Sequence, residues 1–202
     1  YPWIKVLDSS TNVPVMVPPS VVVPGAIAQS DRLQAEWFAP AGLNRGILGN
    51  VIEAKIRLNQ SERDKLYDAK INPIATFPQT GVCIWGQKTL QERSTALDRI
   101  NVRRLLITLK KFIGSSSKYL VFEQNTDETR IRFLNIVNPY LESVQQKQGL
   151  FAFRVQMDES NNTPDVIDRN QLVGAIYLQP TKTAEFIVLD FNVLPTGATF
   201  PA

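Results

Sequence analysis

The sequence is poor in the side chains that most enzymes use for catalysis. It contains no histidine, so the commonest general base and a frequent metal ligand are missing. Its single cysteine, Cys83, excludes an internal disulfide and a cysteine cluster for metal. Because Cys83 lies within an apolar run, we expect a buried and unreactive thiol.

Other features are also absent. No apolar run is long enough to cross a membrane, and no signal peptide opens the chain. Tyr1 stands where an initiator methionine would be, so we expect a fragment or a processed product. The net charge of +3 over 202 residues is smaller than that of a dedicated nucleic-acid binder.

One stretch has part of the spacing of a phosphate-binding loop. In Gly81–Gly86, however, the intervening Val-Cys-Ile-Trp favours a strand, and Gln87 separates the glycine from Lys88. The carboxylates are scattered, and Asp64 and Asp68 lie one turn apart on a short charged helix. We therefore predict a protein that is not an enzyme, with no cofactor, metal site or small-molecule substrate.

The most informative stretch that is present runs from Gly81 to Ile113. Val82–Trp85 is apolar and β-favouring, which is typical of a buried strand. Ser94 or Thr95 can cap a long helix, and Gly114 can end it. At about 100° per residue the helix has a core stripe, formed by Val102, Leu105, Leu106, Leu109, Phe112 and Ile113.

The opposite face of this helix is basic with an apolar centre. It carries Arg99, Arg103, Arg104, Lys110 and Lys111, and among them Ile100 and Ile107. One interpretation is a solvated charged face whose isoleucines lie under a neighbouring element. The other is a contact face with an apolar centre and a basic rim that binds an acidic partner.

The rest of the chain alternates strand and helix patterns, so we predict one α/β domain over residues 1–202, with a small mixed sheet and two long helices. The expected strands are 3–7, 51–58, 82–85, 119–123, 151–157, 173–178 and 185–193. Ser61 and Asp64 resemble a capping box for a short helix ending at Ala69. Residues 127–148 predict the second long helix, with a kink at Pro139.

The last predicted strand has two possible roles. Its residues are Glu185, Phe186, Ile187, Val188, Leu189, Asp190, Phe191, Asn192 and Val193. The strand can belong to the sheet of this domain. It can also be an exposed strand that pairs with another chain, with residues 185–202 as a C-terminal arm. The two roles are compatible if the sheet is shared between this domain and the other chain.

Several stretches together resemble the C-terminal core domain of contractile bacteriophage tail sheath proteins, especially those of the T-even type. The matching motifs are WFAPAG (37–42), LYDAKINPI (66–74), GVCIWGQKTL (81–90), NVRRL (101–105), FEQN (122–125), NTPDVID (162–168) and PTKTAEFI (180–187). Their order and spacing over about residues 30–194 make the resemblance specific.

This resemblance implies a structural protein of the virion, assembled in the host cytoplasm. Such subunits stack as rings around an inner tail tube between the baseplate and a tail terminator protein. They contract to drive the tube into the host cell, without nucleotide hydrolysis. Their N- and C-terminal arms lend strands to sheets of neighbouring subunits, and the core domain lies nearest the tube, so the basic helix is a candidate tube contact.

Two further functions remain open from the sequence. The chain can belong to the sheath of a tailocin or another contractile injection system. It can also be a nucleic-acid-binding module that uses the basic helix 94–113, although the modest net charge argues against this.

Overall fold

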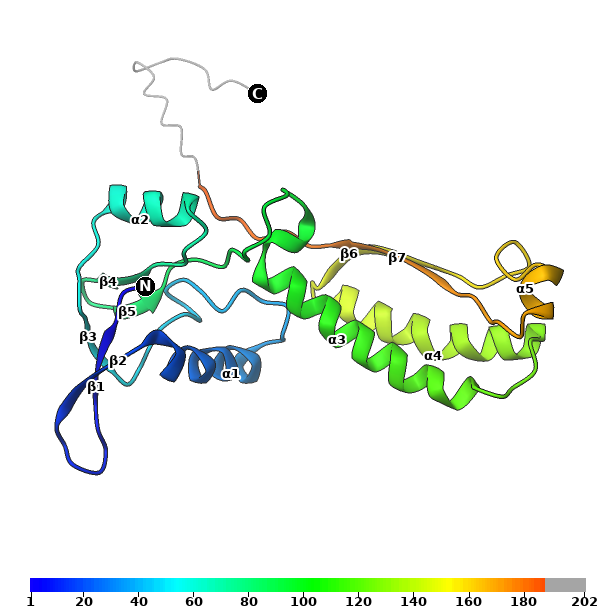
Figure 1. The fold of residues 1–202 in the computed structure, drawn as a ribbon, viewed down its shortest axis with the longest axis horizontal. Helices are drawn as coiled ribbons and strands as arrows, with labels where there is room; N and C mark the ends of the chain where they lie inside the picture. The colour runs from blue at the N-terminus through cyan, green and yellow to red at the C-terminus, as the bar shows by residue number, and fades with distance from the viewer. Residues whose placement is uncertain (188–202) are drawn as a thin grey trace, which may run out of the picture.

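Short strands dominate the first half of the chain. In the computed structural model, which describes residues 1–187, β1 (Ile4–Leu7), β2 (Pro14–Val17) and β3 (Val51–Ala54) form an antiparallel sheet in the order β2-β1-β3 (Figure 1). A second antiparallel pair joins β4 (Ile74–Phe77) to β5 (Gly81–Ile84). The helical segments here are η1 (Pro19–Val21), α1 (Val23–Leu33) and α2 (Gln60–Asp68). Their core contains Ile4, Ala26, Leu48, Ala54, Ile74, Val82 and Ile84.

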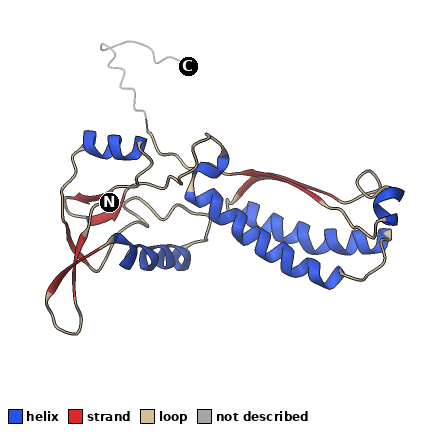
Figure 2. Cartoon of the chain, viewed as in Figure 1, coloured by secondary structure: helices blue, strands red, loops and turns tan. Residues whose placement is uncertain are grey.

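Two antiparallel helices dominate the second half. After η2 (Ala96–Asp98), α3 (Ile100–Ser117) leads through η3 (Lys118–Leu120) to α4 (Asp127–Gln146). The strands β6 (Leu150–Gln156) and β7 (Ala175–Pro180) pair antiparallel along the helices, and α5 (Pro164–Asp168) lies between them in the chain (Figures 1 and 2). Apolar residues spaced along both helices fill one core: Leu105, Leu109, Leu120, Phe133, Val137, Leu141, Val144, Leu150 and Met157.

The two halves are joined by side chains as well as by the backbone. Trp37 donates a hydrogen bond from Nε1 to the carbonyl of Lys147 at 2.9 Å, and its ring lies close to Gly149. Arg104 of α3 pairs with Asp31 of α1 at 2.5 Å. These contacts fix α3 relative to the first half, and α3 begins beside the candidate site described below.

The predicted α/β class is confirmed, but the arrangement of the sheets differs. Within residues 1–187 the strands form three separate antiparallel sheets rather than one mixed sheet. The prediction of a strand at 119–123 is wrong: the segment is η3 followed by a turn, in which Phe122 has a φ of +73°. Short apolar stretches like this one fit a turn between helices as well as a strand.

Both ends of the first long helix differ from the prediction. The helix starts at Ile100, because Arg99 is held extended by an isolated bridge to Lys88. It continues through Gly114 to Ser117, where serine hydroxyls donate to carbonyls of the preceding turn. The capping box of α2 uses Asn59 and Glu62, two residues before the predicted pair.

Candidate functional site

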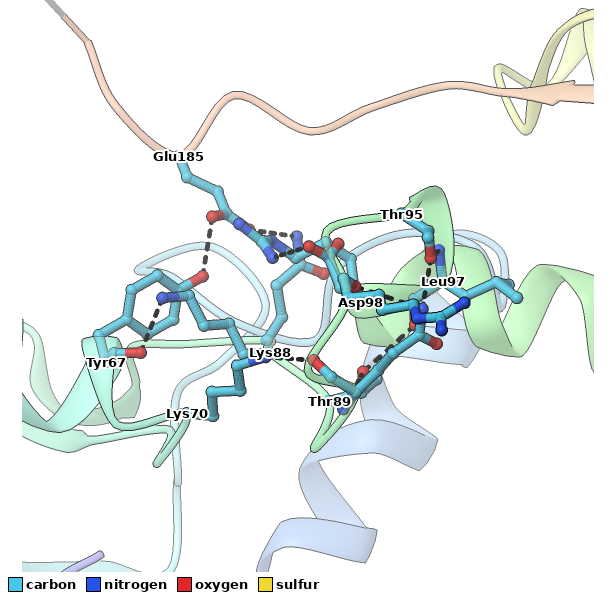
Figure 3. Close-up of polar contacts among 12 residues, drawn as sticks. Tyr67, Lys70, Lys88, Thr89, Thr95, Leu97, Asp98 and Glu185 are labelled. Carbon is cyan, nitrogen blue, oxygen red and sulfur yellow. Dashed lines mark hydrogen bonds and ion pairs between the residues drawn. The ribbon is translucent and has the colours of Figure 1, made fainter.

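Glu185 lies at the centre of a polar cluster, in the segment 181–187 that follows β7. Its carboxylate accepts hydrogen bonds from Arg99 Nε at 2.7 Å, from Tyr67 Oη at 2.8 Å and from Gln87 Nε2 at 3.2 Å. Gln87 Nε2 also donates to the hydroxyl of Thr183. We call these five residues the Glu185 network. It connects α2, the segment after β5 and the start of α3 to one side chain (Figure 3).

A second layer of polar contacts holds these elements in place. The side-chain amide of Asn72 bonds both backbone groups of Lys88, at 2.9 and 2.8 Å. Lys88 Nζ donates to the carbonyl of Tyr67 at 2.7 Å and lies 3.9 Å from the centre of its ring. These contacts hold the backbone and the ring of Tyr67 in the position from which its hydroxyl bonds the Glu185 carboxylate.

The charges of the network are balanced. Burial alone would raise the pKa of Glu185, but the hydrogen bonds from Arg99 and Tyr67 and the charge of Arg99 outweigh it, so this pKa lies below its ordinary value. Burial and the hydrogen bond to Glu185 raise the pKa of Tyr67. The hydrogen bond to Glu185 also raises the pKa of Arg99, which pairs with Asp98 at 3.1 Å as well.

This arrangement suits anchoring of the segment 181–187 to the rest of the described structure. Arg99, Tyr67 and Gln87 each direct a hydrogen bond at the Glu185 carboxylate. Among residues 1–187 no group of three or more histidine, cysteine, aspartate or glutamate side chains is placed to bind a metal ion. Burial raises the pKa of Cys83 to about 11, so its thiol stays protonated. No described helix is both long and apolar enough to span a membrane.

The structure divides the predicted basic face. Two of its cations have partners within the chain: Arg99 joins the Glu185 network, and Arg104 pairs with Asp31 and donates to the carbonyl of Glu36. Ile100 is half-buried at the first position of α3. The exposed remainder consists of Arg103, Ile107, Lys110 and Lys111, with 57% of Ile107 accessible to solvent. We call these four residues the exposed α3 face.

Only the beginning of the predicted C-terminal strand lies within the described residues. Glu185, Phe186 and Ile187 form no strand there, and the last two side chains are 78% and 81% exposed. Val188–Val193 lie outside the described residues. The prediction that this segment pairs with another chain stays a prediction.

Tyr67, Gln87 and Thr183 were not predicted from the sequence to be functional residues. They lie in three of the quoted motifs, LYDAKINPI, GVCIWGQKTL and PTKTAEFI, and Glu185 belongs to the last of these. Membership of these motifs was the signal that the sequence offered. That the motifs converge on one carboxylate is seen only in the structure.

Family models match almost the whole chain. One described as "Phage tail sheath protein central domain" matches residues 1–90, and one described as "Phage tail sheath C-terminal domain" matches residues 92–194. This chain belongs to the phage tail sheath family. The models divide it near residue 91, and the prediction of one core domain over 1–202 remains a prediction.

Curated relatives carry the name tail sheath protein. The protein of Vibrio phage KVP40 is 41% identical over 91% of this chain, and that of Enterobacteria phage T4 is 40% identical over 96%. The chain spans 27% and 29% of the length of these two relatives. The matched region is therefore less than one third of each of these tail sheath proteins.

Solved structures with this fold include sheath proteins of an extracellular contractile injection system and of the anti-feeding prophage. The PVC sheath complex in its contracted state matches with a TM-score of 0.85 and 30% identity, over 95% of this chain and 54% of that one. The contracted helical sheath of the anti-feeding prophage matches with a TM-score of 0.84 and 26% identity, with the same coverage. A chain of the anti-feeding prophage baseplate has a TM-score of 0.83, also at 26% identity.

Proposed function

We propose that this chain is part of a sheath subunit that polymerises as a helical cylinder around an inner tail tube and contracts to drive the tube into the host cell during genome delivery. The similarity to tail sheath proteins along residues 1–194 carries this proposal. The partners would be further copies of the chain, the tail tube protein, and the baseplate and tail terminator proteins, with assembly in the host cytoplasm. The energy would come from changes in packing, with no catalytic turnover and no membrane contact.

The phage tail is favoured over an injection system by sequence identity. The three curated phage relatives are 35–41% identical to the chain, whereas the two injection-system sheaths are 26–30% identical. The nucleic-acid-binding alternative is weakened because Arg99 and Arg104 have partners within the chain. Three exposed cations on α3 make a small electrostatic footprint for nucleic acid.

The C-terminal segment 185–193 would pair with a neighbouring subunit. Within the described residues β6 and β7 pair only with each other, so each strand keeps one edge whose backbone groups can pair with an added strand. Residues 186–193 supply alternating apolar side chains for such a strand. Glu185 would then mark the point where a segment bound to its own subunit becomes a segment donated to the next.

The exposed α3 face would contact the tail tube. Ile107 gives it an apolar centre, and Arg103, Lys110 and Lys111 give it a rim of positive charge. Exposed charge pairs each contribute only about 0–1 kcal/mol. Contacts of this kind would hold subunits in register on an acidic tube and release when the sheath contracts.

Negative-stain electron microscopy across protein and salt concentrations tests the proposal. We expect striated tubes or stacked rings, with a diameter that distinguishes the narrow extended form from the wide contracted one. Uniform small particles at every concentration would refute self-assembly. Binding to DNA that weakens steeply with salt would favour the nucleic-acid alternative.

A further inference from the structure

A second feature lies beside the Glu185 network, at the N-terminus of α3. A cleft of about 440 Å³ separates the turn that precedes this helix from the C-terminal segment. Ser94, Asp98 and Asn101 lie on one side of it, and Lys182 and Phe186 lie on the other. Arg99, Thr183 and Glu185 of the Glu185 network also line the cleft.

Asn101 has an unusual environment for a buried amide. The residue is 3% exposed, and its Oδ1 accepts no hydrogen bond from the described residues. Buried polar groups nearly always have a partner, and leaving one without a partner is unfavourable. Asn101 lines the cleft, so a ligand in the cleft could supply the missing donor.

The backbone beside Asn101 adds hydrogen-bond donors. Arg99 occupies the N-cap position of this 18-residue helix, and its side chain makes no capping bond. The first turn also contains no acidic residue. The first N–H groups of a helix need acceptors from outside the helix. The N–H of Ile100 already donates to the carbonyl of Gln87 at 2.8 Å, whereas those of Asn101 and Val102 have no acceptor among the described residues. The cleft therefore contains an acceptor that needs a donor, and it lies at a helix end with N–H groups that can bond an acceptor.

The charges around the cleft favour an uncharged ligand. Asp98 and Glu185 are balanced by Arg99, which bonds both of them, and by Lys182. A free carboxylate would therefore meet two acidic side chains as well as two basic ones. A peptide group has one N–H donor and one carbonyl acceptor, and the side-chain amide of asparagine has an NH₂ group that donates and a carbonyl that accepts, so the two groups can bond each other on both sides.

We propose that this cleft binds an extended, uncharged main-chain segment of a neighbouring copy of the chain, with the side-chain amide of Asn101 bonded to a peptide group of that segment. The neighbour follows from the proposed sheath function, on which this inference rests. Phe186, 78% exposed at the edge of the cleft, would cover apolar side chains of the bound segment.

Asn101→Ala tests the proposal, with Asn135→Ala as the matched control. Asn135 is exposed within α4, so both substitutions place alanine in a helix. We expect Asn101→Ala to leave the melting temperature of the unassembled subunit unchanged or raised, because no internal acceptor bond is lost. We expect it to raise the protein concentration needed for assembly about tenfold, the effect of losing one or two hydrogen bonds at an interface. Asn135→Ala should leave that concentration unchanged.

A photo-crosslink identifies the occupant. Ser94, which is exposed and lines the cleft, would be replaced by p-benzoylphenylalanine, and the assembled protein irradiated. Crosslinks to a neighbouring copy, mapped by mass spectrometry, would support the proposal. Crosslinks confined to the same chain would overturn it. A lower melting temperature of the free Asn101→Ala subunit, or unchanged assembly of that variant, would also overturn it. If the unsubstituted protein itself does not assemble, the proposed sheath function fails instead.

Discussion

Replacing Glu185 by alanine should destabilise the subunit measurably, although the residue lies outside both hydrophobic cores. The substitution removes the acceptor shared by Arg99, Tyr67 and Gln87. A buried donor left without a partner costs roughly 1–3 kcal/mol. The side chains of Glu185 and Arg99 keep 16% and 26% of their exposure, so water replaces part of what is lost. We expect a total loss of about 2–3 kcal/mol.

Differential scanning calorimetry of the unassembled subunit measures this loss. For a chain of this length each kcal/mol corresponds to about 2–4 °C, so the melting temperature should fall by about 4–12 °C. Glu185→Gln keeps one acceptor oxygen and should lose about half as much. Glu159→Ala removes an exposed carboxylate and should change stability by less than about 0.5 kcal/mol. If Glu185→Ala melts within 1–2 °C of the unsubstituted protein, roughly the spread of the control, the anchoring role is refuted.

Three further predictions follow from the same structure. Because the pKa of Glu185 lies below its ordinary value of 4.5, its contribution to stability is complete above that pH and is lost as the pH falls through the lower, folded-state pKa. The stability gap between the unsubstituted protein and Glu185→Gln should therefore narrow in thermal melts as the pH falls below about 4.5. Gly149→Ala should cost about 1–3 kcal/mol in urea unfolding, because a Cβ there would lie 2.7 Å from a valine methyl and 3.0 Å from an indole ring. Gly114→Ala should instead stabilise the protein by about 0.5–1 kcal/mol, because Gly114 lies within α3 and a Cβ there would meet open space. Equal effects of the two substitutions would contradict the close packing around Gly149. Arg103→Glu combined with Lys110→Glu should leave the melting temperature unchanged but reduce extended-sheath assembly on tubes by electron microscopy, and unchanged assembly would exclude a tube contact here.

Periodicity predicted the elements that bury an apolar stripe. The long helix 127–148 was predicted within two residues of α4 because Phe133, Val137, Leu141 and Val144 recur at helical spacing. The strand at Val82–Trp85 overlaps β5 because its apolar run leaves few alternatives. Where the apolar signal is short, as at 119–123, the local sequence does not distinguish a strand from a turn.

The candidate site could not be predicted from local patterns. The partners of Glu185 lie 86 to 118 residues away in the sequence. No local rule relates a tyrosine on a charged helix to a glutamate in the C-terminal segment. Helical periodicity placed Arg99 and Arg104 on a surface face, and the tertiary structure gave each an acidic partner within the chain. Spacing shows which residues share a face, but it does not show which element covers that face.

The location of Glu185 bears on how a sheath subunit could move without losing its neighbours. If residues 186–193 are donated in trans, any force along that segment enters the subunit at its root. At Glu185 the backbone connects the segment directly to β7 alone. The side chain of Glu185 adds a connection to α2 through Tyr67 and one to the start of α3 through Arg99. The force would then be shared between both halves of the subunit. An anchor worth about 2–3 kcal/mol is small beside the stability of a whole domain, but it would oppose motion at the point where a donated strand would join its own subunit.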